Sequence, residues 1–368
     1  MITTLQMNMR SLSWASAKII LLFAVFVPFC WGGVAGKAAA PRDGTNLDGA
    51  LLGVDMAKWM NDDLDHSLPL VETLKVKWVR FGIAWERIEP SPGRYDWEQL
   101  DRIVNETARH RLHLLVTLRA LNSWAGTHHA GNSHETEGHQ AATPPKDLAQ
   151  FARFVGAIAG RYKGHGVCWQ IENEPNLDVY WLGTREDYVH LLKTAYAAIH
   201  KADPAATVVS AGIACEFFEN LGAPEQRLAH LKPWFDAVLE SKAFDAVDMH
   251  NYFIPEEGNP WGITFGGYIR TVKGWMKDKG VRTPLWITEF AFSSGPLTVR
   301  QKTLSFDAGQ QSRFLDHAVA EAKTEGVQHL FWMFLRDTED GQGNRLGLTA
   351  RDGKTKEAWN QFVRLAED

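Results

Sequence analysis

The chain has 368 residues, of which 45% are hydrophobic and 23% are charged. This composition excludes a disordered chain, because a polypeptide this apolar can bury a large core. A formal net charge of −5, without any run of Lys and Arg residues, excludes a nucleic-acid-binding protein, which needs a basic surface against the phosphates.

The first 40 residues are expected to be a signal peptide that lies outside the fold. Arg10 and Lys18 precede an uncharged apolar stretch, and three alanines at positions 38–40 form an A-x-A cleavage site. A membrane anchor is the alternative, since residues 19–36 carry no charge and approach the length of a span. We therefore expect a secreted or periplasmic protein, anchored to the inner membrane if the segment is retained.

From residue 51 onwards, short apolar runs alternate with amphipathic stretches, which is typical of repeated βα units around a parallel sheet. Eight runs are predicted strands: 52–56, 77–83, 112–118, 167–173, 207–212, 246–250, 285–288 and 328–333. The predicted helices are 68–74, 97–110, 147–162, 185–201, 234–241, 263–279, 307–325 and a last one near 356–365. Eight such units predict an α/β fold, a single (β/α)8 TIM barrel, with residues 41–368 as one catalytic domain.

Removal of residues 1–40 leaves two cysteines, Cys168 and Cys215. The strand assignment places them near opposite ends of neighbouring strands, too far apart for a disulfide. Two free, buried thiols are predicted.

Two glutamates follow apolar strands at the edge where a (β/α)8 barrel places its catalytic groups. Glu174 comes at the end of the fourth strand, before Pro175, and Glu289 comes at the end of the seventh. A single Glu near a strand end is usually a solvated loop residue, but two at equivalent positions favour a function. Strands four and seven face each other across the barrel mouth, so the two carboxyl groups are expected to meet there.

Paired carboxyl groups indicate glycoside hydrolysis, in which one protonates the leaving oxygen and the other attacks or stabilises the anomeric carbon. In retaining enzymes the two groups lie about 5 to 5.5 Å apart. We predict Glu174 as the general acid/base and Glu289 as the nucleophile. The charge of Glu289 is expected to raise the pKa of Glu174 and keep it protonated.

Other strand ends offer groups that suit the same reaction. Arg80 and Tyr252 are predicted to hold Glu289 ionised through charge-assisted hydrogen bonds. Asn173 is predicted to bind the sugar 2-hydroxyl, a contact that strengthens in the transition state. The alternative for Arg80 is an ion pair that merely fills the barrel.

A histidine and several aromatic residues complete the predicted substrate site. His250 ends the sixth strand, and Trp332 lies at the end of the eighth, where it is expected to form a floor under the sugar ring. Trp124, Trp181 and Trp261 lie in loops and are candidates for stacking on further sugar units. The alternatives are a core histidine, a core tryptophan and packing anchors.

The longest loop, 119–145, contains four histidines: His128, His129, His134 and His139. Their spacing fits no zinc-binding pattern, and catalysis by paired carboxylates needs no metal. Neither a metal nor another cofactor is predicted.

Four segments together resemble clan A of the glycoside hydrolases: residues 80–97 (RFGIAWERIEPSPGRYDW), Asn173-Glu174-Pro175-Asn176, His250-Asn251-Tyr252 and Thr288-Glu289-Phe290. The stretch after Pro175 is most similar to family 39, which contains β-xylosidases, α-L-iduronidases and periplasmic hydrolases of biofilm exopolysaccharides. The resemblance covers residues 50–365 and implies a retaining mechanism with Glu174 as acid/base and Glu289 as nucleophile. The ending of the third strand departs from the family pattern.

A stand-alone barrel behind a signal peptide is more similar to the exopolysaccharide hydrolases of that family than to its xylosidases. The expected activity is therefore endo-acting hydrolysis of a β-linked polysaccharide or oligosaccharide by a monomer. Two alternatives stay open. One is an exo-acting β-xylosidase, and the other is a catalytically silent barrel that only binds polysaccharide.

Overall fold

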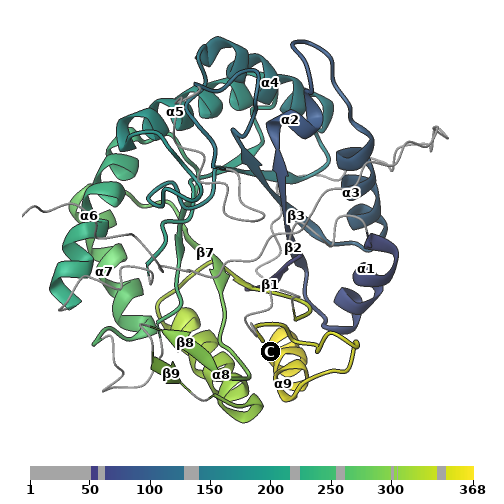
Figure 1. The fold of residues 1–368 in the computed structure, drawn as a ribbon, viewed down its shortest axis with the longest axis vertical. Helices are drawn as coiled ribbons and strands as arrows, with labels where there is room; N and C mark the ends of the chain where they lie inside the picture. The colour runs from purple at the N-terminus through teal and green to yellow at the C-terminus, as the bar shows by residue number, and fades with distance from the viewer. Residues whose placement is uncertain are drawn as a thin grey trace, which may run out of the picture.

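The computed structural model describes residues 51–56, 63–127, 141–215, 224–253, 262–299, 302–304, 306–337 and 345–368. In these residues, parallel strands form a central ring, and helices surround it on the outside (Figure 1). The predicted signal peptide, the loop histidines at 128, 129, 134 and 139, and Trp261 all lie outside the described residues.

The ring contains eight strands: β1 Leu52–Asp55, β2 Trp78–Ala84, β3 His113–Arg119, β4 Val167–Ile171, β5 Thr207–Val209, β6 Val247–His250, β7 Leu285–Phe290 and β10 His329–Trp332. The helices are α1 Leu64–Thr73, α2 Trp85–Ile88, α3 Glu98–Arg109, α4 Leu148–Arg161, α5 Arg185–Ala202, α6 Pro224–Ser241, α7 Phe265–Asp278, α8 Ala308–Thr324 and α9 Glu357–Glu367. A small hairpin, β8 Leu297–Val299 and β9 Lys302–Leu304, follows β7.

All neighbouring strands of the ring pair in parallel, in the order β5-β4-β3-β2-β1-β10-β7-β6. Two isolated bridges, Val209 to Ala246 and Ile213 to Met249, join β5 to β6 and close the ring. Each of the eight predicted strands is present, so the prediction of a (β/α)8 barrel is confirmed.

The helices agree with the prediction except around proline. Helix α6 begins at Pro224, ten residues before the predicted start, and continues through Pro233. Helix α1 likewise contains Pro69 and begins at Leu64. A proline inside a helix removes one backbone hydrogen bond, which is why the sequence favoured a later start for α6. The short helix α2 and the β8–β9 hairpin were not predicted.

The interior of the ring is layered, because alternate residues of each strand point inwards. An apolar layer closes the end where the strands begin, and its members are Trp78, Leu115, Cys168, Val209, Ala246, Trp286 and Phe331. Above it lies a buried polar layer made of Asp55, Arg80, Thr117, Gln170, Asp248 and Thr288. This polar layer supports the side chains at the carboxyl ends of the strands.

Cys168 and Cys215 are both buried and free, as predicted. Among the described helices, none combines the length and the apolar character needed to cross a membrane.

Candidate active site

Glu174 follows the carboxyl end of β4, and its backbone adopts an unfavourable conformation. Glu172 and Glu174 both have positive φ values, 69° and 44°, in a region that costs a non-glycine residue about 1–3 kcal/mol. The surroundings hold this conformation: the Glu172 carboxylate accepts from the backbone N–H groups of Ala120 (2.5 Å) and Asn173 (3.1 Å). The N–H of Glu174 donates to the carbonyl oxygen of Gly212 at 3.1 Å. Strain supported in this way is typical of functional sites.

Strands β6 and β7 place His250 beside Glu289. An irregularity in the ladder between Met249 and His250 pairs His250 with Glu289, and the Asn251 N–H donates to the Glu289 carbonyl oxygen at 3.0 Å. Without this shift in register, His250 would pair with the residue before Glu289.

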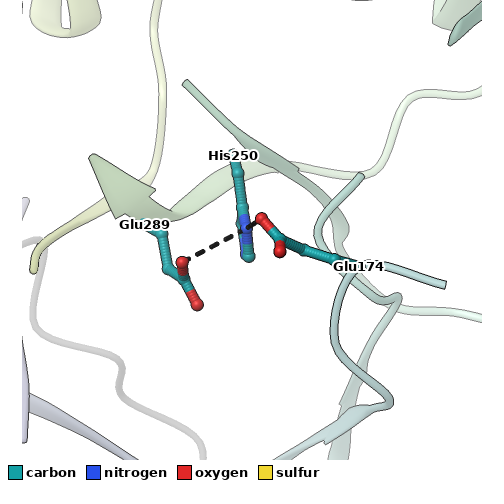
Figure 2. Close-up of side chains that lie close together, drawn as sticks. All are labelled: Glu174, His250 and Glu289. Atoms are coloured by element: carbon teal, nitrogen blue, oxygen red, sulfur yellow. Dashed lines mark hydrogen bonds and ion pairs between the residues drawn. The ribbon is translucent and has the colours of Figure 1, made fainter. Parts of the chain in front are cut away.

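Glu174, His250 and Glu289 meet at the mouth of the barrel (Figure 2). His250 Nδ1 lies 2.7 Å from Glu174 Oε1 and 3.4 Å from Glu289 Oε2. One oxygen of each glutamate and one histidine nitrogen all lie within 4.8 Å of one another. The residues are 2%, 0% and 7% exposed, so water screens these charges little.

Both oxygens of Glu289 accept hydrogen bonds from the two partners that the sequence suggested. Arg80 Nη1 donates to Glu289 Oε1 at 2.6 Å, and the Tyr252 hydroxyl donates to Oε2 at 2.7 Å. Arg80 also donates to Asp55 Oδ2 (2.5 Å) and Asn173 Oδ1 (2.8 Å). Arg80 does not end its strand, because β2 continues to Ala84; it lies inside the ring and reaches up to the site.

The two carboxyl groups have pKa shifts of opposite sign. Burial and the charge of Glu289 raise the pKa of Glu174, although the contact with His250 opposes them. Burial acts to raise the pKa of Glu289 too, but the charges of His250 and Arg80 and the bonds from Tyr252 and Arg80 outweigh it and lower that pKa. Glu174 therefore retains its proton to higher pH than Glu289 does.

Burial acts to lower the pKa of His250, but the carboxylates around it prevail and raise that pKa to about 9. The imidazole is therefore protonated at neutral pH. A protonated histidine between two carboxyl groups supports the ionised state of Glu289 and offers an N–H to Glu174.

The predicted aromatic residues lie mainly in the core. Trp332 is fully buried, packs edge-on against Phe290 at 5.0 Å between ring centroids, and donates through Nε1 to the Leu346 carbonyl oxygen. Trp181 is 1% exposed and donates to the Thr184 carbonyl oxygen. The structure thus places both as packing residues and does not bring them to the two glutamates.

Trp124 is half-buried, packs edge-on against Trp85, and donates to the Glu89 carbonyl oxygen at 2.9 Å. These contacts fix it on the loop after β3. The side chain that reaches the site from the end of β10 is Met333, whose sulfur lies 3.2 Å from the Tyr252 hydroxyl oxygen.

Sequence reasoning missed the residues beneath the site. Asp55 accepts from Arg80, and Asp248 accepts from Thr288 and Gln170. A signal for them exists, because each is a polar residue inside an otherwise apolar strand and therefore an inward-pointing position that needs a partner.

Within the described residues, Glu174, His250 and Glu289 form the one group of His, Cys, Asp and Glu side chains close enough together for a metal ion to be considered. Their hydrogen bonds already engage them with one another and with Arg80 and Tyr252. A protonated imidazole is not a metal ligand. We assign no metal to this group.

A (β/α)8 barrel with two glutamates of oppositely shifted pKa at the ends of β4 and β7 has the architecture of the clan A glycoside hydrolases. A family model described as beta-galactosidase, glycosyl hydrolase family 42, matches residues 55–253, which is more than half of the 368-residue chain. The chain belongs to this glycosyl hydrolase family. A second model, described as glycosyl hydrolase catalytic core, matches residues 186–362.

Among curated proteins, a beta-galactosidase of Geobacillus kaustophilus is 27% identical over 132 residues, which are 32% of this chain. The chain spans 20% of the length of that relative.

Solved structures of family 39 enzymes share the fold. One from Bacteroides cellulosilyticus has a TM-score of 0.63 at 18% identity, over 89% of this chain and 65% of that one. A monomeric beta-xylosidase from Caulobacter crescentus has a TM-score of 0.63 at 20% identity, over 89% of this chain and 69% of that one. The resemblance to clan A, with family 39 among the structural neighbours, is confirmed.

Proposed function

We propose that this protein is a retaining glycoside hydrolase in which Glu289 is the nucleophile and Glu174 is the general acid/base. The observation that supports this proposal best is the arrangement of Glu174 and Glu289 around His250, with oxygens of the two carboxyl groups within 4.8 Å and pKa shifts of opposite sign. Inverting enzymes need about 6.5–9.5 Å between the carboxyl groups to admit a water molecule, which is more than this site offers.

In the first step, Glu174 gives its proton to the glycosidic oxygen as the bond to the anomeric carbon breaks. Glu289 attacks that carbon from the opposite face and forms a glycosyl ester. Arg80 and Tyr252 keep Glu289 ionised until it attacks. Because Asn173 Oδ1 accepts from Arg80, its amide NH2 is the group left to donate to the sugar 2-hydroxyl.

In the second step, esterification has removed the negative charge of Glu289, so the pKa of Glu174 falls. Glu174, now a carboxylate, takes a proton from a water molecule as that water attacks the anomeric carbon. The ester bond breaks, Glu289 is released as a carboxylate, and the sugar leaves with its original anomeric configuration.

The substrate class that we propose is a β-linked polysaccharide or oligosaccharide, cleaved internally in an exported exopolysaccharide. The proposal of export is based on the basic and apolar pattern of residues 1–40. We further propose that residues 41–368 form a single domain. The relatives described as beta-galactosidase and beta-xylosidase favour an alternative, exo-acting release of single sugars. A monomer suits either activity.

The test uses purified protein with aryl β-glycosides and a panel of bacterial and plant polysaccharides. Wild type is compared with Glu174→Ala and Glu289→Ala, each with and without azide, which can replace a missing carboxylate. The proposal expects both variants to lose activity, with azide yielding the α-glycosyl azide from Glu289→Ala and the β-glycosyl azide from Glu174→Ala. A wild type that binds a polysaccharide but hydrolyses none of these substrates would favour the silent-binding alternative.

A further inference from the structure

His250 has a second set of contacts on the side facing away from Glu174. Its Nε2 lies 3.2 Å from Thr288 Oγ1, and the Thr288 hydroxyl donates to Asp248 Oδ2 at 2.5 Å. Asp248, Thr288 and His250 are 1%, 0% and 0% exposed. These three residues form a buried column that ends at Glu174, which we call the Asp248 column.

The donors around Asp248 fix the direction of these hydrogen bonds. Oδ2 accepts from Gln170 Nε2 (2.5 Å) as well as from the Thr288 hydroxyl, and Oδ1 accepts from the Thr288 backbone N–H (2.9 Å). Burial raises the pKa of Asp248 to about 6, although the charge of His250 and the bonds from Thr288 oppose it, so the carboxyl group is ionised at neutral pH and accepts from these donors. The single hydroxyl hydrogen of Thr288 therefore points to Asp248, and Thr288 Oγ1 presents a lone pair to His250. His250 Nε2 must then carry a hydrogen.

With Nε2 protonated, the state of Nδ1 determines where the acid proton of Glu174 lies. A neutral imidazole would accept at Nδ1, so the proton of Glu174 would sit on Oε1 and point at the histidine. A doubly protonated imidazole donates from Nδ1 to Oε1 instead. The proton of Glu174 then sits on Oε2, the oxygen that His250 does not occupy.

The charges around the ring favour the doubly protonated state. Asp248 Oδ2 lies 3.9 Å from Nε2, and Glu289 Oε2 and Glu174 Oε1 lie 3.4 Å and 2.7 Å from Nδ1. The guanidinium of Arg80 is engaged with Glu289 and Asp55. The ring is thus faced by three carboxyl groups, those of Glu174 after β4, Asp248 in β6 and Glu289 in β7. The charge of Arg80 in β2 is balanced by its own carboxylate partners.

We propose that Thr288 and Asp248 are positioning residues, which keep His250 doubly protonated so that the catalytic proton of Glu174 is held on Oε2 and available to the substrate. The glycine at position 212 leaves room for the ring in this orientation, since a Cβ there would overlap the imidazole. The inference rests on the proposed function of Glu174 and adds to it the residues that aim its proton.

The test compares Thr288→Val, which keeps the shape but removes the hydroxyl, with Thr288→Ser, which restores the hydroxyl. Each is assayed on aryl glycosides with a poor leaving group (phenyl) and with an activated one (dinitrophenyl), since only the poor one depends on the acid. Because general acid catalysis contributes about 10²–10⁴-fold, we expect the loss in kcat/KM for Thr288→Val on the phenyl substrate to exceed that on the dinitrophenyl substrate by about tenfold or more. Thr288→Ser is expected to recover most of this difference.

The titration of His250 supplies a second readout. Removing the negative charge in Asp248→Asn, or the acceptor in Thr288→Val, makes the doubly protonated ring less stable, so the pKa of His250 is expected to fall. Thr107→Val, a buried threonine in α3 that bonds only backbone carbonyl oxygens of its own helix, is the matched control and should alter neither readout.

A readout without substrate separates this inference from the proposed function. Nitrogen NMR of histidine-labelled wild type, with His250 assigned by its loss in His250→Gln, should show both ring nitrogens protonated at neutral pH. Equal losses of Thr288→Val on both substrates, or a neutral His250 in the spectrum, would overturn the inference while leaving the roles of Glu174 and Glu289 intact. Failure of the azide experiment with a doubly protonated His250 in the spectrum would instead overturn the roles of Glu174 and Glu289, and with them the catalytic use of the proton on Glu174, while the protonation of the ring would stand.

Discussion

Arg80 and Glu289, which are 209 positions apart in the sequence, form a buried ion pair with 2.6 Å between Nη1 and Oε1. The same guanidinium donates to Asp55, Asn173, Thr117 and Gln170, so Arg80 links the polar layer of the barrel to the nucleophile that we propose. Five contacts from one planar group need the fork geometry of arginine.

We therefore expect Arg80→Lys to be a severe change although it preserves the charge. A lysine ammonium has three donors on a flexible stem and cannot satisfy these partners together. Breaking a buried ion pair costs about 3–5 kcal/mol, and the loss of fixed donors at an active site costs about 10²–10³-fold in kcat. Thermal unfolding and steady-state kinetics measure both effects. A variant with wild-type kcat would show that Arg80 only fills the barrel.

Tyr252→Phe tests the other donor to Glu289. Removing the hydroxyl takes away a bond that lowers the pKa of Glu289, so that pKa should rise. The acidic limb of the kcat/KM profile is then expected to move to higher pH. At the optimum, kcat should fall about 10- to 100-fold, as for one lost hydrogen bond to a charged group of about 1.5–3 kcal/mol. An unchanged acidic limb would contradict the role of Tyr252.

The two glutamates should affect stability in opposite directions as pH changes. The pKa of Glu174 is raised in the folded protein, so its contribution to stability is present below its unfolded pKa of about 4.3 and is lost as pH rises through the folded value. Glu174→Gln should therefore become more stable relative to wild type as pH increases.

The pKa of Glu289 is lowered, so its contribution is present above about pH 4.3 and is lost as pH falls through the folded value. Glu289→Gln should be less stable than wild type at neutral pH, with a difference that shrinks in acid. Urea unfolding of the three proteins between pH 4 and 8 measures both slopes. Parallel curves for the two variants would refute the assignment.

Gly212 offers a test of close packing against His250. A Cβ there would overlap the imidazole and lie 2.7 Å from Asp248 Oδ2, so Gly212→Ala must displace the ring. We expect a loss of about 1–3 kcal/mol in stability, as for other overpacked sites, and a clear loss of activity. Gly274→Ala is the matched control, since a Cβ added there in α7 would meet no heavy atom within 4 Å beyond its chain neighbours and its own helix backbone. It should stabilise the protein by about 0.5–1 kcal/mol.

Chelation tests whether Glu174, His250 and Glu289 act without a bound metal ion. Because His250 and both glutamates are engaged in hydrogen bonds, dialysis against EDTA should leave both kcat and the melting temperature unchanged. Loss of activity that Zn²⁺ or another divalent ion restores would show instead that the group binds a metal.

The sequence predicted the barrel because buried parallel strands are apolar at nearly every position and are easily counted. It predicted the contacts of Glu289 with Arg80 and Tyr252 because a polar side chain within or directly after an apolar strand stands out. Trp332 was misplaced because position at a strand end does not tell which way a side chain points. Phe331 in β10 and Met333 just after it point inwards, so Trp332 faces α8 and packs there at 6.2 Å from Phe314 between ring centroids.

The sequence could not predict the partners of His250 for a different reason. Asp248 and Thr288 belong to different strands, and only the register of β6 against β7 brings them into contact. A single residue of slip in that ladder would reverse which side chains point inwards. Sequence periodicity gives the direction of a side chain within its own strand, but it does not give the neighbour across the ladder.

An apolar layer closes the barrel at the amino end of the strands, where Trp78, Trp286 and Phe331 are fully buried. This layer leaves one end of the barrel through which molecules can enter and leave. Substrate, leaving sugar and water must all use the same open end. In a double displacement, the leaving sugar therefore has to depart before water can reach the glycosyl ester from that side. Any hydroxyl compound that enters the vacated space first competes with water, so high concentrations of acceptor sugars should divert the ester into new glycosidic bonds.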